Sequence, residues 1–185
     1  YIAKKTNSKN PVMLIYNKNL SVSPITTHTP IKHVAKFIKK EKIINNVTKI
    51  DSFYRSKLKK KPKIAILGLN PHCETTDRVS EEQQEINPAI KYLQKIKVKV
   101  TGPIAADTFF LHKNIKKFDV VIGMYHDQVL PSIKTIYNFE AINITLGLPF
   151  LKITPDHGPN QEMVGKNKSD PSSIFYALNF LNKYK

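Results

Sequence analysis

The chain has 185 residues, 41% of them hydrophobic, and a single cysteine, so it suits one domain and excludes an internal disulfide. No apolar run reaches the about 18 residues that a membrane-spanning helix needs, and the setting that we expect is the reducing cytoplasm. The net charge of +16 comes almost entirely from lysine, which cannot reproduce arginine's planar grip on bases and phosphates, so acidic small molecules fit better than nucleic acid as partners.

Short apolar runs bounded by turn residues predict strands over residues 12–16, 20–27, 63–69, 98–101, 118–123 and 141–146. Capping residues and apolar spacing predict helices over residues 30–38, 47–59, 80–93 and 170–181, and a short helix near Asp107. The lysine-rich residues 57–63 are expected to form a solvated helix end and linker. Strands that alternate with helices predict an α/β fold with a largely parallel sheet flanked by helices.

The stretch from Met124 to Lys134 follows the predicted strand 118–123, which is apolar enough to be buried. His126 and Asp127 therefore fall just past the carboxyl end of a strand, where open α/β sheets place their ligands. A histidine, a carboxylate and the Lys134 cation within nine residues suggest a binding site. The plainer interpretation is a strand end with a capping aspartate and a surface histidine.

Three histidines, His28, His72 and His126, each follow a predicted strand by a few residues. The strands of a parallel sheet end at one edge, so the three imidazoles are able to converge there. Three neutral imidazoles bind a divalent cation such as zinc and leave a position open for substrate. No HxxxH or CxxC spacing supports this, and isolated capping or core histidines are the alternative.

Six segments in a fixed order connect these features: residues 26–28 (TTH), 67–72 (LGLNPH), 102–108 (GPIAADT), 124–128 (MYHDQ), 143–150 (NITLGLPF) and 156–158 (DHG). Together they closely resemble the 4-hydroxythreonine-4-phosphate dehydrogenase family of pyridoxal phosphate biosynthesis. The likeness runs from His28 to about Asp170, and the uninterrupted run 143–150 is its most specific part.

The resemblance implies an oxidoreductase of the isocitrate/isopropylmalate dehydrogenase type of fold, which binds NAD or NADP without a G-x-G-x-x-G turn. It implies a homodimer with the site near the interface and a divalent zinc, magnesium or cobalt ion. The family's metal-ligand positions fall on His28, His72 and His126. Its contacts to the phosphorylated substrate fall on Lys134, Asn143 and Lys152, and its nucleotide loop falls on Asp156, His157, Gly158 and Asn160.

The implied reaction is hydride transfer from the hydroxyl-bearing carbon of 4-phosphooxy-L-threonine to NAD, followed by loss of CO2 to give 3-amino-2-oxopropyl phosphate. We expect two catalytic residues. Lys134 would donate or accept a proton, and Asp127 would orient a ligand imidazole, with a helix cap as the alternative for Asp127. His33 and His112 match no motif and are expected to be ordinary surface residues.

The sequence departs from the family's pattern in several places. Lys152 stands where arginine is usual, the segment after His72 has no glycine before Glu81, and Pro159-Asn160 replaces a usual Thr-Ala. The family's N-terminal portion, with a Gly-His-Thr substrate motif, is not found before Tyr1. We therefore expect the C-terminal half, or slightly more, of a longer enzyme, with residues 1–63 and 64–185 as two candidate subdomains.

Two rival functions remain open at this point. One is a related metal- and NAD-dependent dehydrogenase that acts on another phosphorylated hydroxy acid, which a substrate panel would distinguish. The other is a non-catalytic basic module that binds nucleic acid. That module predicts salt-sensitive binding to DNA or RNA with little effect of chelators.

Overall fold

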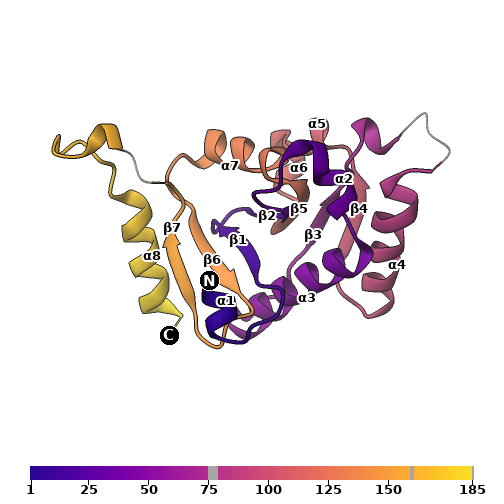
Figure 1. Ribbon diagram of the computed structural model, residues 1–185, viewed down its shortest axis with the longest axis horizontal. Helices are drawn as coiled ribbons and strands as arrows, with labels where there is room; N and C mark the ends of the chain where they lie inside the picture. Colours follow the sequence, from indigo (N-terminus) through magenta and orange to yellow (C-terminus); the bar gives the residue numbers. More distant parts are fainter. Residues whose placement is uncertain (75–78, 159–160, 185) are drawn as a thin grey trace.

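The computed structural model describes residues 1–74, 79–158 and 161–184, and Figure 1 shows a central sheet with helices around it. The strands are β1 (Val12–Tyr16), β2 (Ser21–Thr26), β3 (Ile64–Leu67), β4 (Val100–Ile104), β5 (Val120–Tyr125), β6 (Ile142–Leu146) and β7 (Lys152–Pro155). The α-helices are α1 (Ile2–Lys5), α2 (Val34–Phe37), α3 (Lys40–Ser56), α4 (Asn87–Lys95), α5 (Ala106–Phe109), α6 (His112–Ile115), α7 (Leu130–Tyr137) and α8 (Ser172–Lys183). Tighter 3-10 turns lie at Ile31–His33, Pro71–Cys73, His126–Gln128 and Gln161–Met163, and a wider π-helical turn lies at Glu82–Ile86.

The seven strands in the described part of the chain join one sheet in the order β4-β3-β5-β2-β1-β6-β7. β4, β3, β5 and β2 pair in parallel, whereas β1 runs antiparallel to β2 and β6, and β7 runs antiparallel to β6. Five of the seven strands therefore point the same way. This confirms the predicted α/β fold with a largely parallel sheet. Strands from both sides of the boundary between residues 63 and 64 belong to this sheet.

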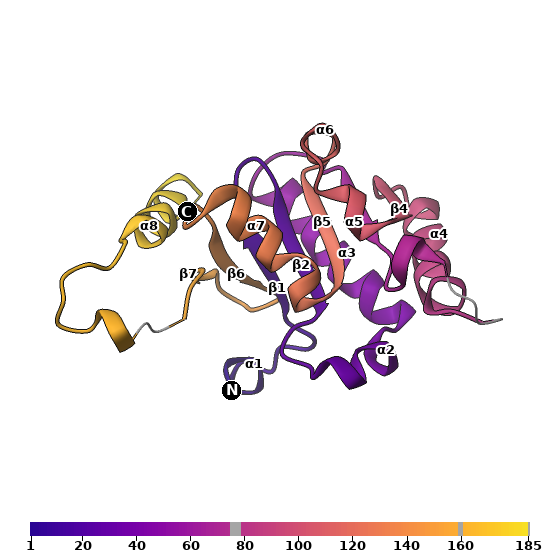
Figure 2. The ribbon, with the colours of Figure 1, turned by 90° about the horizontal axis from the view of Figure 1, so that it is seen from above.

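Helices cover both faces of the sheet because its central strands are apolar on both faces. Along β5, Val120, Ile122 and Met124 face one core and Val121 faces the other. The first core packs against α3, α4 and α8, and the second against α5, α6 and α7. Figure 1 shows α7 above the sheet and α3 below it, and Figure 2 shows α7 crossing in front of the strands.

The predicted helices differ from the observed ones mainly at their ends, and α1, α6 and α7 were not predicted. α3 begins at Lys40, before the predicted start at residue 47, because Ile43 already lies on its buried face. The predicted helix over residues 80–93 starts as the π turn and becomes regular only at Asn87. Strand β7 was not predicted, since its residues are all of intermediate burial and lack an apolar run. No helix in the described ranges is long and apolar enough to cross a membrane.

Candidate active site

A pocket of about 530 Å³ lies between α7 and the face of the sheet formed by β1, β6 and β7. Apolar side chains of Met13, Ile15 and Leu130 form part of its wall. The remaining lining includes seven residues that the sequence predicted for the site: His28, His126, Lys134, Asn143, Asp156, His157 and Gly158. Residues that are up to 130 positions apart in the chain, from His28 to Gly158, therefore share one cavity.

The two histidines of this pocket lie close together because their strands are neighbours. β2 and β5 pair in parallel as far as Thr26 and Tyr125, so the residues that follow them, His28 and His126, leave the same edge of the sheet. The hydroxyl of Thr26 donates to the carbonyl of Met124 at 2.8 Å, which ties the two strand ends together. The imidazole centroids lie 5.9 Å apart.

Asp127 lies beside the His126 imidazole. Its Oδ1 is 2.5 Å from His126 Nδ1, a distance at which the ring N–H donates to the carboxylate. This hydrogen bond selects the tautomer that leaves the Nε2 lone pair free, as in histidines that bind metals. This is the contact that an orienting Asp127 would make, and the 3-10 turn His126–Gln128, which contains Asp127, has no side-chain cap hydrogen bond.

His72 lies outside this pair within one chain. It follows β3, the neighbour of β5 on the other side, but its Nδ1 lies 3.9 Å from Asp107 Oδ2, and 73% of its side-chain surface is exposed. The described residues accordingly contain no cluster of three His, Cys, Asp or Glu side chains around one point. The structure therefore brings together two of the three predicted metal ligands and leaves the third facing outwards.

The donor set of the pocket fits a divalent cation in part. Two imidazoles, one of them oriented by a carboxylate, are the nitrogen ligands that zinc and cobalt prefer. Asn143 adds a side-chain amide oxygen, Oδ1, that is buried and has no hydrogen-bond partner. A buried acceptor without a partner is rare in folded proteins, and this one belongs to a residue that lines the pocket.

Lys134 and Asp156 form the charged pair of the pocket. Lys134 Nζ donates to the Asp156 carbonyl at 2.5 Å and to its Oδ2 at 3.1 Å. Burial raises the pKa of the Asp156 carboxyl, and the Lys134 charge and hydrogen bond oppose that rise. Lys134 is thereby held at the end of β7, with 42% of its side-chain surface still exposed to the cavity.

Lys152 lies on the same face of the sheet as the pocket but outside its wall. In the register of β6 and β7, Asn143 pairs with Thr154 and Thr145 pairs with Lys152. Because side chains alternate along a strand, Lys152 and Thr154 point to the same side, with Lys152 two residues further from Asp156. The structure thus places Lys152 at the edge of the site.

The predicted nucleotide loop begins where β7 ends. His157 Nδ1 lies 3.1 Å from the Gly158 carbonyl, and its ring meets Phe139 edge-on with centroids 6.1 Å apart. No described residue lies within 4 Å of the position of a Cβ on Gly158, so none of them packs against the backbone there. Asn160, the last residue predicted for this loop, lies outside the described residues.

Two polar residues of the site region were not singled out from the sequence. Gln128 accepts the Met124 N–H at 2.6 Å and donates to the Gly68 carbonyl at 2.8 Å, so it joins β5 to β3. The buried Ser173 accepts the Asp156 N–H at 3.0 Å and fixes the end of β7 to α8. The available signals were the place of Gln128 in the 124–128 segment and of Ser173 at a predicted helix start.

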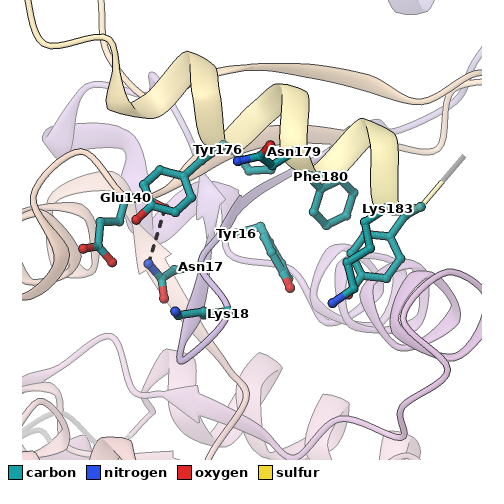
Figure 3. Close-up of a pocket in the computed structure, with 10 residues that line it drawn as sticks. Tyr16, Asn17, Lys18, Glu140, Tyr176, Asn179, Phe180 and Lys183 are labelled. Atoms are coloured by element: carbon teal, nitrogen blue, oxygen red, sulfur yellow. Dashed lines mark hydrogen bonds between the residues drawn. The ribbon is translucent and has the colours of Figure 1, made fainter.

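A smaller pocket of about 240 Å³ lies between the end of β1 and α8 (Figure 3). Four of its ten lining residues are aromatic, with Tyr16 edge-on to Phe180 at 5.0 Å, and burial raises the pKa of Tyr16 to about 12. It holds none of the predicted residues among those described, and it lies where Tyr16 pairs with Ile142, the start of β6. We therefore assign the site to the larger pocket.

Comparison with known proteins shows what the chain as a whole is similar to. The family model described as "Pyridoxal phosphate biosynthetic protein PdxA" matches residues 1–181. The chain is 44% identical to the 4-hydroxythreonine-4-phosphate dehydrogenase of Sulfurihydrogenibium sp. (strain YO3AOP1), over 96% of the chain and 55% of that protein. It is 40% identical to the protein of the same name from Aquifex aeolicus (strain VF5), over 98% of the chain and 56% of that protein.

A solved structure gives the same result for the fold. The crystal structure of 4-hydroxythreonine-4-phosphate dehydrogenase from Klebsiella pneumoniae superposes with a TM-score of 0.82 at 30% identity. The match covers 97% of this chain and 56% of that one. The chain thus spans about half the length of the relatives that it matches.

Proposed function

The chain belongs to the PdxA family of pyridoxal phosphate biosynthetic proteins, and from this premise we propose that it is part of an NAD-dependent 4-hydroxythreonine-4-phosphate dehydrogenase. The proposed reaction, placed in the cytoplasm, is oxidation and decarboxylation of 4-phosphooxy-L-threonine to 3-amino-2-oxopropyl phosphate. The observation that supports it most is the single pocket that holds His28, His126, Lys134 and Asn143 next to the loop that starts at Asp156.

The first role of the chain's own residues in this proposal is to bind a metal ion. His28 and His126 hold a divalent zinc, magnesium or cobalt ion, and Asp127 keeps the His126 ring in place. When bound, such an ion supplies Lewis-acid polarisation of the substrate's oxygen atoms. His72 points away from the pair, so we propose that a second copy of the chain supplies this imidazole and that the active form is a homodimer.

Binding of the substrate is proposed to rest on Lys134, Asn143 and Lys152. Lys134 lines the pocket together with the two imidazoles, so in this proposal it neutralises a substrate anion and moves a proton. Asn143, which lines the pocket, offers its side-chain amide to the substrate. The nicotinamide nucleotide, NAD or NADP, is proposed to lie along the open backbone at Gly158.

The proposal is tested with the full-length protein and 4-phosphooxy-L-threonine as substrate. We expect NADH formation that EDTA abolishes and that added zinc, magnesium or cobalt restores. A panel of other phosphorylated hydroxy acids, assayed in parallel, reports the substrate range. NADH formation that EDTA leaves unchanged would contradict the metal assignment, and turnover only of another hydroxy acid would contradict the substrate.

Lys152 offers a second test because it stands where the family usually has arginine. Lys152→Arg is expected to keep or lower KM, since arginine adds a bidentate grip on phosphate or carboxylate. Lys152→Ala is expected to weaken substrate binding by about 1.5–3 kcal/mol, the value of a hydrogen bond to a charged group. Lys116→Ala, at an exposed lysine remote from the pocket, is the matched control. Equal KM values for the unmodified protein, Lys152→Arg and Lys152→Ala would show that Lys152 does not bind the substrate.

A further inference from the structure

The turn that carries His72 has a strained backbone. His72 and Cys73 both lie in the left-handed region, with φ of 55° and 61°, although neither is glycine. Such conformations persist only where the surrounding structure holds them. Gly68 at the start of the turn leaves no room for a side chain, because a Cβ there would lie 2.7 Å from Cys73 Sγ. The direction of the His72 imidazole is therefore set by whatever holds this turn.

Glu82 is the main partner of the turn. Its Oε1 accepts the backbone N–H groups of Leu69 and Asn70, both at 2.8 Å, and its Oε2 accepts the Asn70 side-chain amide at 2.8 Å. The residue is 2% exposed. Burial acts to raise the pKa of Glu82, but the hydrogen bonds from Asn70 and Leu69 outweigh it and leave the pKa below its ordinary value. A buried carboxylate thus directs its hydrogen-bonding capacity to the two residues that precede Pro71-His72.

The backbone around Glu82 is itself unusual. Glu82 opens the π-helical turn that ends at Ile86, and Ile86 is fully buried. A π turn inserts an extra residue into a helix and occurs frequently at functional sites. Here the widened turn lets Glu82 face the end of β3 while Ile86 remains in the core.

The turn that carries His72 is also tied to β5, the strand that His126 follows. Gln128 donates to the Gly68 carbonyl at 2.8 Å and accepts the Met124 N–H at 2.6 Å. Glu82 holds the next two residues after Gly68, so hydrogen bonds fix the turn from both sides. This connects the two histidine-bearing segments through one short network.

From these contacts we propose that Glu82 is a positioning residue, which sets the direction of the His72 imidazole by holding the Leu69 and Asn70 amides. The inference rests on the proposed function, in which His72 is a metal ligand. Glu82 itself touches neither metal nor substrate in this scheme. It acts through the turn, as a hydrogen-bonding partner behind a ligand does in other metal sites.

The test compares Glu82→Ala and Glu82→Gln in the full-length protein. Glu85→Gln is the matched control, because Glu85 lies in the same π turn but accepts from Lys39 Nζ at 2.9 Å and from the Lys40 N–H at 2.7 Å. Co²⁺ affinity is measured by titration, and hydrogen exchange is measured at the Leu69 and Asn70 amides. Glu82→Ala is expected to weaken Co²⁺ binding by about 10- to 100-fold and to speed exchange at both amides. Glu82→Gln keeps one carbonyl oxygen, so its Co²⁺ affinity and amide exchange should lie between those of Glu82→Ala and those of the unmodified protein. Glu85→Gln should match the unmodified protein in both measurements.

A double variant separates positioning from simple stabilisation. If Glu82 acts through His72, Glu82→Ala adds no further loss of Co²⁺ affinity to His72→Ala, whereas an independent structural effect adds its full amount. If Glu82→Ala does not fold, Glu82→Gln is carried through the same comparison. Losses that add would overturn the positioning role. The positioning role would also be overturned if His72→Ala weakens Co²⁺ binding but Glu82→Ala and Glu82→Gln leave it unchanged. The proposed function would still stand in that case. An unchanged affinity in His72→Ala would instead remove His72 from the metal site, and with it both claims about this residue.

Discussion

Replacing His126 with alanine is expected to lower kcat/KM by about 1,000-fold. In the proposed function His126 binds the divalent ion, and the ion stabilises the transition state by roughly 4 kcal/mol. His28→Ala should have an effect of similar size, since the two imidazoles face one point from neighbouring strands. Asp127→Ala should cost less, about 10- to 100-fold, because Asp127 orients the His126 ring without binding the ion.

The controls for these variants are His33→Ala and His112→Ala, which remove exposed histidines that do not line the pocket. Both should leave kcat/KM and Co²⁺ affinity unchanged. Steady-state NADH formation and Co²⁺ titration are measured on the same preparations, so that loss of the ion and loss of chemistry can be compared. A His126→Ala enzyme with native Co²⁺ affinity and native kcat/KM would show that the pair is not a metal site.

The sequence predicts the backbone of this site well because strand ends are local features. An apolar run ending in a polar segment identifies where β2 and β5 stop, and the parallel pairing of these two strands places His28 and His126 at one edge. The family's segments extend this to Lys134 and Asn143, which line the same pocket. The placement of each of these residues depends on the strand that it follows or occupies and on the face to which it points.

The direction of His72 could not be predicted in the same way. It depends on two left-handed residues, His72 and Cys73, and on a carboxylate ten or more positions later that accepts from the turn. No periodic pattern in the sequence encodes such an arrangement. Strand β7 was missed for a related reason, since an edge strand of intermediate burial carries little apolar signal.

Glu82 illustrates what a sequence pattern can hide. Glu81 and Glu82 are predicted as the polar start of a helix, where acidic residues favour the helix dipole. In the structure Glu82 is nearly fully buried, whereas its less buried neighbour Glu81 accepts the Asn70 side-chain amide at 3.1 Å. The π turn rotates one of two identical residues inwards, and this rotation was not visible in the sequence.

The 185-residue chain by itself is expected to show no dehydrogenase activity, although it contains the pocket. The chain spans about 55% of its relative from Sulfurihydrogenibium, so in the relatives other parts of the protein are available to close the site. Lys152, two residues from the pocket-lining Thr154, lies outside the pocket's wall, and no described residue lies within 4 Å of a Cβ position on Gly158. Catalysis by positioning is sensitive to geometry, and a misplacement of about 1 Å can cost roughly 100-fold in rate.

The same chain is also expected to associate with itself. The outward face of α8 exposes Ile174, Phe175 and Leu178 by 48%, 59% and 51%, and adjoining apolar side chains of this size usually find a partner. NAD reduction by the 185-residue chain is therefore compared with that of the full-length enzyme, and the mass of each is measured by light scattering. Substituting Phe175 and Leu178 by serine should reduce the association of the short chain without restoring activity. Full activity from a monomeric 185-residue chain would show that the pocket between α7 and β7 is complete within these residues, because no second wall and no second copy would then be needed.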